Sequence, residues 1–205
     1  LEAATVLGLS EVTFLDYIDG DLDQAIPEEA IAKIVNEIRR IRPHVVVTFP
    51  PDGAYGHPDH IAISQFTHAA VVCAADASYR TDTAIADTRG AHRVDKFYYL
   101  VDSGYVEEVL NELGMDLGMT VDGVRRKLIA WPAWAITTWV DATPHWRTVW
   151  QAINCHHSQV AGMEGIEQLP GDVHRRLWGQ GTYYRVFSLV NGGRQREDDL
   201  FAGLR

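Results

Sequence analysis

The order strand, glycine-rich loop, helix across residues 45–75 constrains the fold more than any other feature of the chain. Residues 45–49 (Val-Val-Val-Thr-Phe) form a short apolar run, and Pro50-Pro-Asp-Gly53 is a turn-forming sequence. In open α/β sheets such a junction lies at the carboxyl end of a strand, where ligands bind. The chain is therefore expected to be an α/β protein with a ligand site at this loop. Apolar side chains then recur with helical spacing at Ile63, Phe66, Ala70 and Cys73.

The loop itself has a composition suited to metal chemistry. It reads Gly53-Ala-Tyr-Gly-His-Pro-Asp-His60, and the proline fits the first helical position because its missing N–H would be unsatisfied there. His57 then caps the helix, and His60 lies one turn in on the same side. Neutral imidazole is the commonest protein ligand of zinc, Asp59 can orient a ring nitrogen, and Tyr55 adds a hydroxyl donor. A solvated polar loop is the simpler interpretation, but this cluster within six residues favours a site.

The rest of the chain alternates between helical and strand patterns, as expected for one α/β domain of 205 residues. The clearest amphipathic helix begins at Pro27 and is stopped by Pro43. Other helices are predicted at Glu2–Leu7, Tyr105–Leu113 and from Thr143 to Val160. Strands are predicted at Glu11–Asp16, Val45–Phe49, Lys96–Val101, Ala135–Asp141 and within Leu177–Ser188. Residues 74–93 are predicted to be a loop, and residues 116–122 a flexible insertion near the cleft.

Composition and charge make several partners poor candidates. The chain is 46% hydrophobic and 22% charged, as in ordinary globular proteins, and no apolar run approaches the roughly 18 residues of a membrane span. A formal net charge of −10 disfavours nucleic acid and anionic membranes. We interpret Cys73 and Cys155 as small, buried, reduced side chains, as in a reducing compartment; a disulfide between them is the alternative. We therefore expect a cytoplasmic protein with a small-molecule partner, as a monomer or a homo-oligomer.

The run Tyr-Gly-His-Pro-Asp-His, followed by an apolar helix, resembles the second signature of the LmbE-like, or GlcNAc-phosphatidylinositol de-N-acetylase, family of zinc-dependent deacetylases. The resemblance implies a Rossmann-like fold, with a mostly parallel sheet flanked by helices in three layers within a single domain. It also implies that His60 is a zinc ligand and that His57 is the general acid that steadies the oxyanion. By the same resemblance, Asp59 orients His57 and Tyr55 lies near the oxyanion. Zinc follows from the family and the ligand type; Fe²⁺ would also accept two histidines and a carboxylate.

Two further stretches resemble parts of the family. The turn Tyr17-Ile-Asp-Gly20 matches one whose aspartate bonds a sugar hydroxyl, so Asp19 is a candidate substrate ligand; plain turn chemistry explains it equally well. Cys155-His-His-Ser-Gln159 matches the His-x-Ser-Gln motif, in which His156 faces the active-site region without binding metal. A buried histidine bonded to a backbone carbonyl is the equal alternative for His156. A tryptophan cluster is interpreted as core rather than as a sugar pocket: Trp131, Trp134 and Trp139.

The family's first signature, Ala-His-Pro-Asp-Asp-Glu, is not found in these 205 residues. In the family that run supplies a His and an Asp ligand and the general base. We therefore expect residues 1–205 to be a deacetylase domain that lacks its first βαβ unit. The sequence upstream of Leu1 would show whether the protein is an enzyme or a non-catalytic binding module. The predicted function is metal-dependent removal of an N-acyl group, expected to be acetyl, from an amino-sugar-type substrate. Two alternatives stay open: a non-catalytic sugar- or nucleotide-binding α/β module, and a metal-dependent amidase acting on a thiol conjugate or another non-sugar amide.

Overall fold

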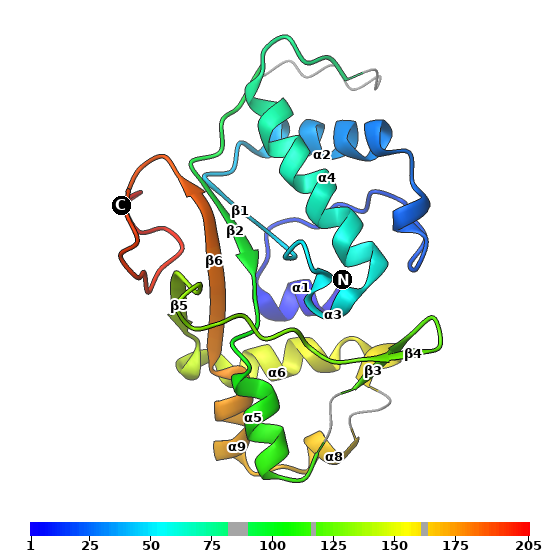
Figure 1. Ribbon diagram of the computed structural model, residues 1–205, viewed down its shortest axis with the longest axis vertical. Helices are drawn as coiled ribbons and strands as arrows, with labels where there is room; N and C mark the ends of the chain where they lie inside the picture. Colours follow the sequence, from blue (N-terminus) through cyan, green and yellow to red (C-terminus); the bar gives the residue numbers. More distant parts are fainter. Residues whose placement is uncertain (82–89, 116–117, 161–163) are drawn as a thin grey trace.

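A four-stranded sheet with helices packed against it forms the centre of the molecule (Figure 1). The computed structural model describes residues 1–81, 90–115, 118–160 and 164–205. The strands are β1 (Val45–Thr48), β2 (Lys96–Leu100), β3 (Met119–Val121), β4 (Val124–Arg126), β5 (Thr138–Asp141) and β6 (Gln180–Ser188). The helices are α1 (Glu2–Leu7), η1 (Leu22–Gln24), α2 (Pro27–Ile41), α3 (Gly53–Gly56), α4 (Pro58–Ala75), α5 (Tyr105–Glu112), η2 (Thr143–His145), α6 (Trp146–Asn154), α7 (His157–Val160), α8 (Glu164–Glu167) and α9 (Gly171–Trp178).

The main sheet has the strand order β1-β2-β6-β5. β1 and β2 run parallel, with Val46 opposite Phe97, whereas β6 is antiparallel to both β2 and β5. The predicted α/β architecture is confirmed, but the sheet is mixed rather than mostly parallel, since two of the three pairings between its described strands are antiparallel. Its antiparallel half arises because β6 begins at Gln180, directly after α9 ends at Trp178, and returns between β2 and β5.

Helices α2 and α4 lie side by side over one face of the sheet (Figure 1). Their apolar side chains meet those of β2 in the largest core cluster, where Val35, Ala70 and Phe97 are fully buried. Burial of this apolar surface, at about 25 cal/mol per Å², is the main force that holds the helix pair on the sheet. It also fixes where α4 begins, and therefore where residues 53–60, here called the histidine loop, lie.

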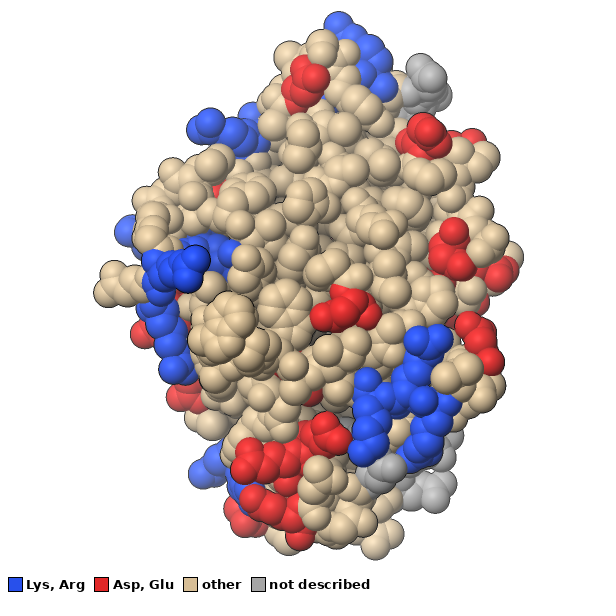
Figure 2. Space-filling view, viewed as in Figure 1, with Lys and Arg blue, Asp and Glu red and all other residues tan. Residues whose placement is uncertain are grey.

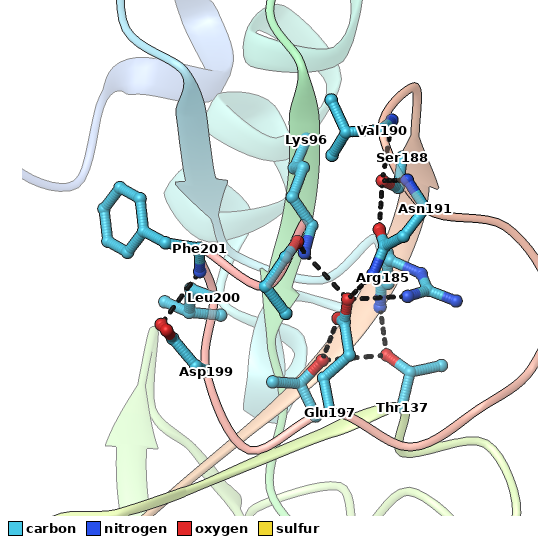
Figure 3. Close-up of polar contacts among 12 residues, drawn as sticks. Lys96, Thr137, Arg185, Ser188, Val190, Asn191, Glu197, Asp199, Leu200 and Phe201 are labelled. Carbon is cyan, nitrogen blue, oxygen red and sulfur yellow. Dashed lines mark hydrogen bonds and ion pairs between the residues drawn. The ribbon is translucent and has the colours of Figure 1, made fainter. Parts of the chain in front are cut away.

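The opposite face of β2 is covered by the C-terminal segment, which is anchored by the buried carboxylate of Glu197 (Figure 3). That carboxylate accepts hydrogen bonds from Lys96 Nζ at 2.7 Å, the Tyr98 hydroxyl at 2.8 Å and the Thr138 hydroxyl at 3.0 Å. Arg185 Nη1 lies 2.8 Å from the same carboxylate. Because Lys96 is fully buried, this network compensates a charge that would otherwise be costly in the interior.

A second apolar cluster lies beyond the ends of β1 and β2 and is built by α5, α6, α8 and α9. Val109, Leu110 and Ile166 are its most buried residues. Figure 1 shows these helices gathered at the end of the sheet where the chain leaves β2 for α5. They form one wall beside the histidine loop.

Several sequence predictions differ from the structure. Residues 11–16, predicted to be a strand, form none. No described strand lies beside them, and a strand without a partner would leave its backbone N–H and C=O groups unpaired. Part of the predicted insertion at 116–122 is instead the β3–β4 hairpin; residues 116–117, and residues 82–89 of the predicted loop at 74–93, lie outside the described residues. The helix predicted from Thr143 to Val160 is broken at Cys155, and α9 was not predicted. No helix in the described part of the chain is long and apolar enough to cross a membrane.

Candidate metal and substrate site

The start of the histidine loop is held by hydrogen bonds to Asp52. Ala54 N–H donates to Asp52 Oδ1 at 2.9 Å, and Gly56 N–H donates to the Asp52 carbonyl oxygen at 3.0 Å. Gly53 has φ +68°, and a Cβ atom there would lie 2.8 Å from the Ile61 side chain, so only glycine fits. The loop therefore presents the side chains that follow it in one fixed arrangement at the start of α4.

His57 caps α4, as predicted, and its bonding assigns a tautomer. Its Nδ1 accepts the backbone N–H of Asp59 at 3.1 Å, so Nδ1 carries a lone pair. In the neutral ring the proton must then lie on Nε2. His57 accordingly offers an N–H donor from Nε2.

His60 has the opposite tautomer. Its Nδ1 lies 3.1 Å from the carbonyl oxygen of Gly53, which can only accept, so Nδ1 carries the proton and Nε2 the lone pair. Burial lowers the pKa of His60, although the bond to Gly53 opposes this shift. A neutral ring with a free Nε2 lone pair is the form that binds a metal ion.

The aromatic rings of the site pack tightly together. The rings of His57 and His60 stack with centroids 4.7 Å apart, and Phe49 stacks on the other side of His60 at 3.8 Å. Tyr55 meets both histidines edge-on, at 5.1 Å from His60 and 5.7 Å from His57. Burial, reinforced by the charge of Asp19, raises the pKa of Tyr55 and keeps its hydroxyl protonated as a donor.

The carboxylate of Asp59 does not orient His57, which corrects the prediction made from the resemblance. Its two oxygens accept the backbone N–H groups of Gly20 at 2.7 Å and Leu22 at 3.1 Å. It is the backbone of Asp59 that contacts His57. The carboxylate instead fastens the 19–22 turn to the first turn of α4.

This anchor brings Asp19 into the site. The charge of Asp19 acts on both Tyr55 and His60, so the aspartate lies close to the two rings. Asp19 and Tyr55 are 36 positions apart in sequence and are joined through the bonds of Asp59 to the turn. The turn that carries Asp19 therefore lies beside the histidine loop.

His156 is not linked to this cluster by any hydrogen bond or ring contact among the described residues. It follows α6 at an exposed position, and its Nδ1 lies 3.0 Å from the Ala152 carbonyl oxygen. The bond to a backbone carbonyl agrees with the second interpretation, but the burial that this interpretation also expected is not observed. Of the tryptophans, Trp131 and Trp139 pack against the core, whereas Trp134 is 84% exposed.

Two contributors to the site were not predicted. Trp131 Nε1 donates to Asp52 Oδ2 at 2.8 Å and so steadies the loop. The guanidinium group of Arg126 lies over Gly56, where an added Cβ would be 2.6 Å from its Nη1. Figure 2 shows basic side chains gathered where the β3–β4 hairpin lies. The turn sequence Asp122-Gly123, with φ +51° and +75°, is the signal that could have revealed this hairpin.

Comparison with known proteins gives a consistent relationship. Residues 1–71, which contain Asp19 and the whole histidine loop, match the family model described as "PIG-L: GlcNAc-PI de-N-acetylase". In these residues the chain is similar to the PIG-L family. The LmbE-like resemblance read from the loop is thereby confirmed.

The relatives are named as hydrolases of amides. One relative is a protein of Geodermatophilus obscurus named 1D-myo-inositol 2-acetamido-2-deoxy-alpha-D-glucopyranoside deacetylase. It is 35% identical over an alignment of 197 residues that covers 92% of this chain and 62% of the relative. A Kineococcus radiotolerans protein of the same name is 34% identical, covering 89% and 52%. A Mycothiol S-conjugate amidase of Streptomyces coelicolor is 27% identical, covering 100% and 74%. The chain thus spans about half to three fifths of the length of the two named deacetylases.

Solved structures confirm the fold. The conserved protein TT1542 from Thermus thermophilus superposes with a TM-score of 0.60 at 19% identity, over 93% of this chain and 72% of that one. GalB, the 4-carboxy-2-hydroxymuconate hydratase from Pseudomonas putida, gives a TM-score of 0.56 at 15% identity, over 94% and 71%. At these identities the likeness shows the fold alone.

The residues described here fit part of a metal site. The donor chemistry of His60 suits a divalent ion, because its Nε2 lone pair is unused and its ring is fixed by Gly53 and Phe49. No group of three or more histidine, cysteine or acidic side chains that could hold an ion occurs among the described residues. Zinc sites in proteins use three or four protein ligands, so His60 would share the ion with ligands from outside this described set.

Proposed function

We propose that this PIG-L-like domain belongs to a metal-dependent hydrolase that removes an N-acyl group, in the first place acetyl, from an amino-sugar-type substrate. Zinc is the proposed ion and His60 its ligand within this chain. The observation that carries the proposal is the pair of opposite tautomers, with a lone pair on His60 Nε2 beside a hydrogen-bond donor on His57 Nε2. The names of the relatives support the same reaction class.

An amide resists hydrolysis because its carbonyl carbon is a weak electrophile. A bound divalent ion supplies a polarised carbonyl and a bound water of lowered pKa. The chain's own residues would stabilise the negative charge that develops on the carbonyl oxygen: His57 Nε2–H and the Tyr55 hydroxyl are the available donors. The Nδ1 bond of His57 favours this donor role over that of an imidazolium acid, because a proton on Nδ1 would face the Asp59 N–H.

Asp19 is the proposed contact to the sugar. A carboxylate accepts hydrogen bonds from hydroxyl groups, and the Asp59 anchor holds the turn of Asp19 against the site. The contribution of His156, the cytoplasmic location and self-association stay predictions. The general base and the remaining metal ligands are not assigned among the described residues.

A second candidate is an amidase acting on a thiol conjugate, favoured by the Streptomyces coelicolor relative, which aligns with all of this chain. Both reactions cleave an amide and would use the same donors. They differ in the group attached to the acyl carbon and to the nitrogen, so substrate comparison separates them.

The test is release of acetate from the acetamido-glucoside of inositol named for the relatives, with the full-length protein and added Zn²⁺. We expect acetate and free amine in equal amounts, and no release after treatment with a chelator. Faster cleavage of a cysteinyl amide conjugate would favour the second candidate. Binding of the glucoside without any release of acetate would identify a non-catalytic module and contradict the proposal.

A further inference from the structure

A cavity of about 400 Å³ opens beside the histidine loop, between the end of β2, the β3–β4 hairpin and helices α5 and α9. Tyr55, Ala54 and Phe49 form the wall nearest the site. The remaining wall is largely apolar and includes Leu100, Val106, Met119, Leu128, Leu177 and Trp178.

Two of the polar groups on this wall, on Thr182 and Asp102, are already hydrogen-bonded. The Thr182 hydroxyl donates to the Val101 carbonyl oxygen at 2.6 Å, and Asp102 Oδ1 accepts the Gly104 N–H at 3.0 Å. The second oxygen of Asp102 is buried without a hydrogen-bond partner among the described residues, and burial raises the pKa of this carboxyl towards the uncharged form. The cavity therefore offers apolar contact area more than it offers hydrogen bonds.

The position of the cavity relative to the donors selects which part of a substrate it can take. Tyr55 lines it, whereas neither His57 nor His60 is among the described lining residues. If Tyr55 and His57 both donate to a carbonyl oxygen, the carbonyl carbon lies beside them with its nitrogen and its acyl substituent on different sides. The substituent on the Tyr55 side would lie at the cavity, and because its wall is largely apolar it suits an alkyl chain better than a hydroxyl-rich sugar, which assigns it to the acyl group.

We propose that this cavity is an acyl-binding pocket and that the protein accepts linear N-acyl groups longer than acetyl, of about four to six carbons. The inference rests on the proposed amide hydrolysis and extends it to the acyl group. Acetyl has one methyl to place, which leaves most of a 400 Å³ cavity unused. Each added methylene buried there is expected to improve binding about fourfold.

The experiment compares N-hexanoyl with N-acetyl glucosaminide in the full-length protein, together with binding of hexanamide and acetamide measured by saturation-transfer NMR. We expect a kcat/KM for the hexanoyl substrate at least equal to that for the acetyl substrate, and hexanamide binding at least tenfold tighter than acetamide. Leu100→Trp fills the cavity from β2, where Leu100 is 44% exposed and tolerates a larger side chain. It should lower the hexanoyl-to-acetyl ratio of kcat/KM at least tenfold.

Val47→Trp is the matched control, because Val47 is a β1 residue with 43% exposure that is not among the residues lining the cavity. It should leave the ratio unchanged. Equal effects of the two variants, or hexanoyl turnover tenfold below acetyl in the unmodified protein, would overturn the inference while the hydrolase assignment stands. Hexanamide binding that Leu100→Trp abolishes, with no hydrolysis of either substrate, would keep the pocket and refute the proposed function.

Discussion

Asp59 Oδ2 accepts the backbone N–H of Gly20 at 2.7 Å, and this bond ties two segments 39 residues apart into one site. The other carboxylate oxygen holds Leu22, so the turn that carries Asp19 is fastened at two points to the start of α4. Asp59 is only 9% exposed, and this burial strengthens both bonds relative to surface contacts.

Replacing Asp59 tests this anchor. Asp59→Asn keeps the shape but exchanges one acceptor oxygen for an N–H₂ group, which cannot accept from a backbone N–H. The free energy of unfolding should fall by about 1–3 kcal/mol, and kcat/KM should fall with it because Asp19 loses its fixed position. Urea unfolding and zinc content check this, with Asp23→Asn in η1 as control. Unchanged stability, or loss of bound metal, would show that the carboxylate has another role.

His57 can be tested without removing the helix cap. His57→Asn retains a good N-cap residue, so stability should change little, whereas the Nε2–H donor is lost. We expect kcat to fall roughly 10²–10³-fold, the usual effect of removing one oxyanion donor. Losses should be equal on an N-acetyl amine and on an activated phenyl acetate. A loss confined to the amine would instead assign His57 as the acid that protonates the leaving group.

The ionisation of Glu197 should make the free energy of unfolding fall at acidic pH. Burial opposes its ionisation, but hydrogen bonds from Lys96, Asn191, Tyr98 and Thr138 outweigh burial and lower the pKa of Glu197 to about 2. Because the folded-state pKa lies below the unfolded value of 4.5, the stabilisation is complete above about pH 4.5 and is lost as pH falls towards 2. Chemical denaturation across this range should show the decline.

Glu197→Gln provides the variant for the same network. It should cost about 3–5 kcal/mol at pH 7, because Lys96 stays buried with its charge uncompensated, and it should flatten the acid decline. Glu112→Gln, which removes a surface pair with Arg176, should cost less than about 1 kcal/mol. Similar costs for the two variants would mean that the buried network does not anchor the C-terminal segment.

The contact between Gly56 and Arg126 predicts an energetic coupling. Gly56→Ala introduces a Cβ 2.6 Å from Arg126 Nη1 at φ +75°, so it should destabilise by more than the roughly 1–2 kcal/mol of left-handed strain. In an Arg126→Ala background only the strain should remain. A double-mutant cycle should give a coupling of about 0.5–3 kcal/mol, and Gly8→Ala, at φ +68° with nothing nearby, serves as the strain control. Strict additivity would argue against the contact.

The sequence could predict the features that depend on neighbouring residues. The strand from Val45, the cap at His57 and the helix from Pro58 were all readable, because turn residues and helical spacing act over a few positions. The bond from Asp59 to Gly20 was not readable, since it joins segments brought together only by the packing of α4 against η1. A carboxylate next to a histidine in sequence can point away from it once the helix forms.

Strand formation failed as a prediction for the same reason. Residues 11–16 alternate as a strand should, yet a strand exists only when a partner pairs with it, and none of the described strands lies beside them. As a result Phe14 is 67% exposed. The β3–β4 hairpin is the opposite case, because a local sequence signal, the turn Asp122-Gly123, does indicate it.

The most direct test of the account is the zinc affinity of the full-length protein and its His60→Ala variant, measured by competition with a chromophoric chelator. His68→Ala is the control, because His68 lies on the same helix and its Nδ1 is 3.0 Å from the Tyr99 hydroxyl, away from the loop. We predict that His60→Ala weakens zinc binding by at least about 100-fold, beyond the usual effect of residues that only support a ligand, and abolishes acetate release, while His68→Ala changes neither. Zinc bound by His60→Ala as tightly as by the unmodified protein would contradict it.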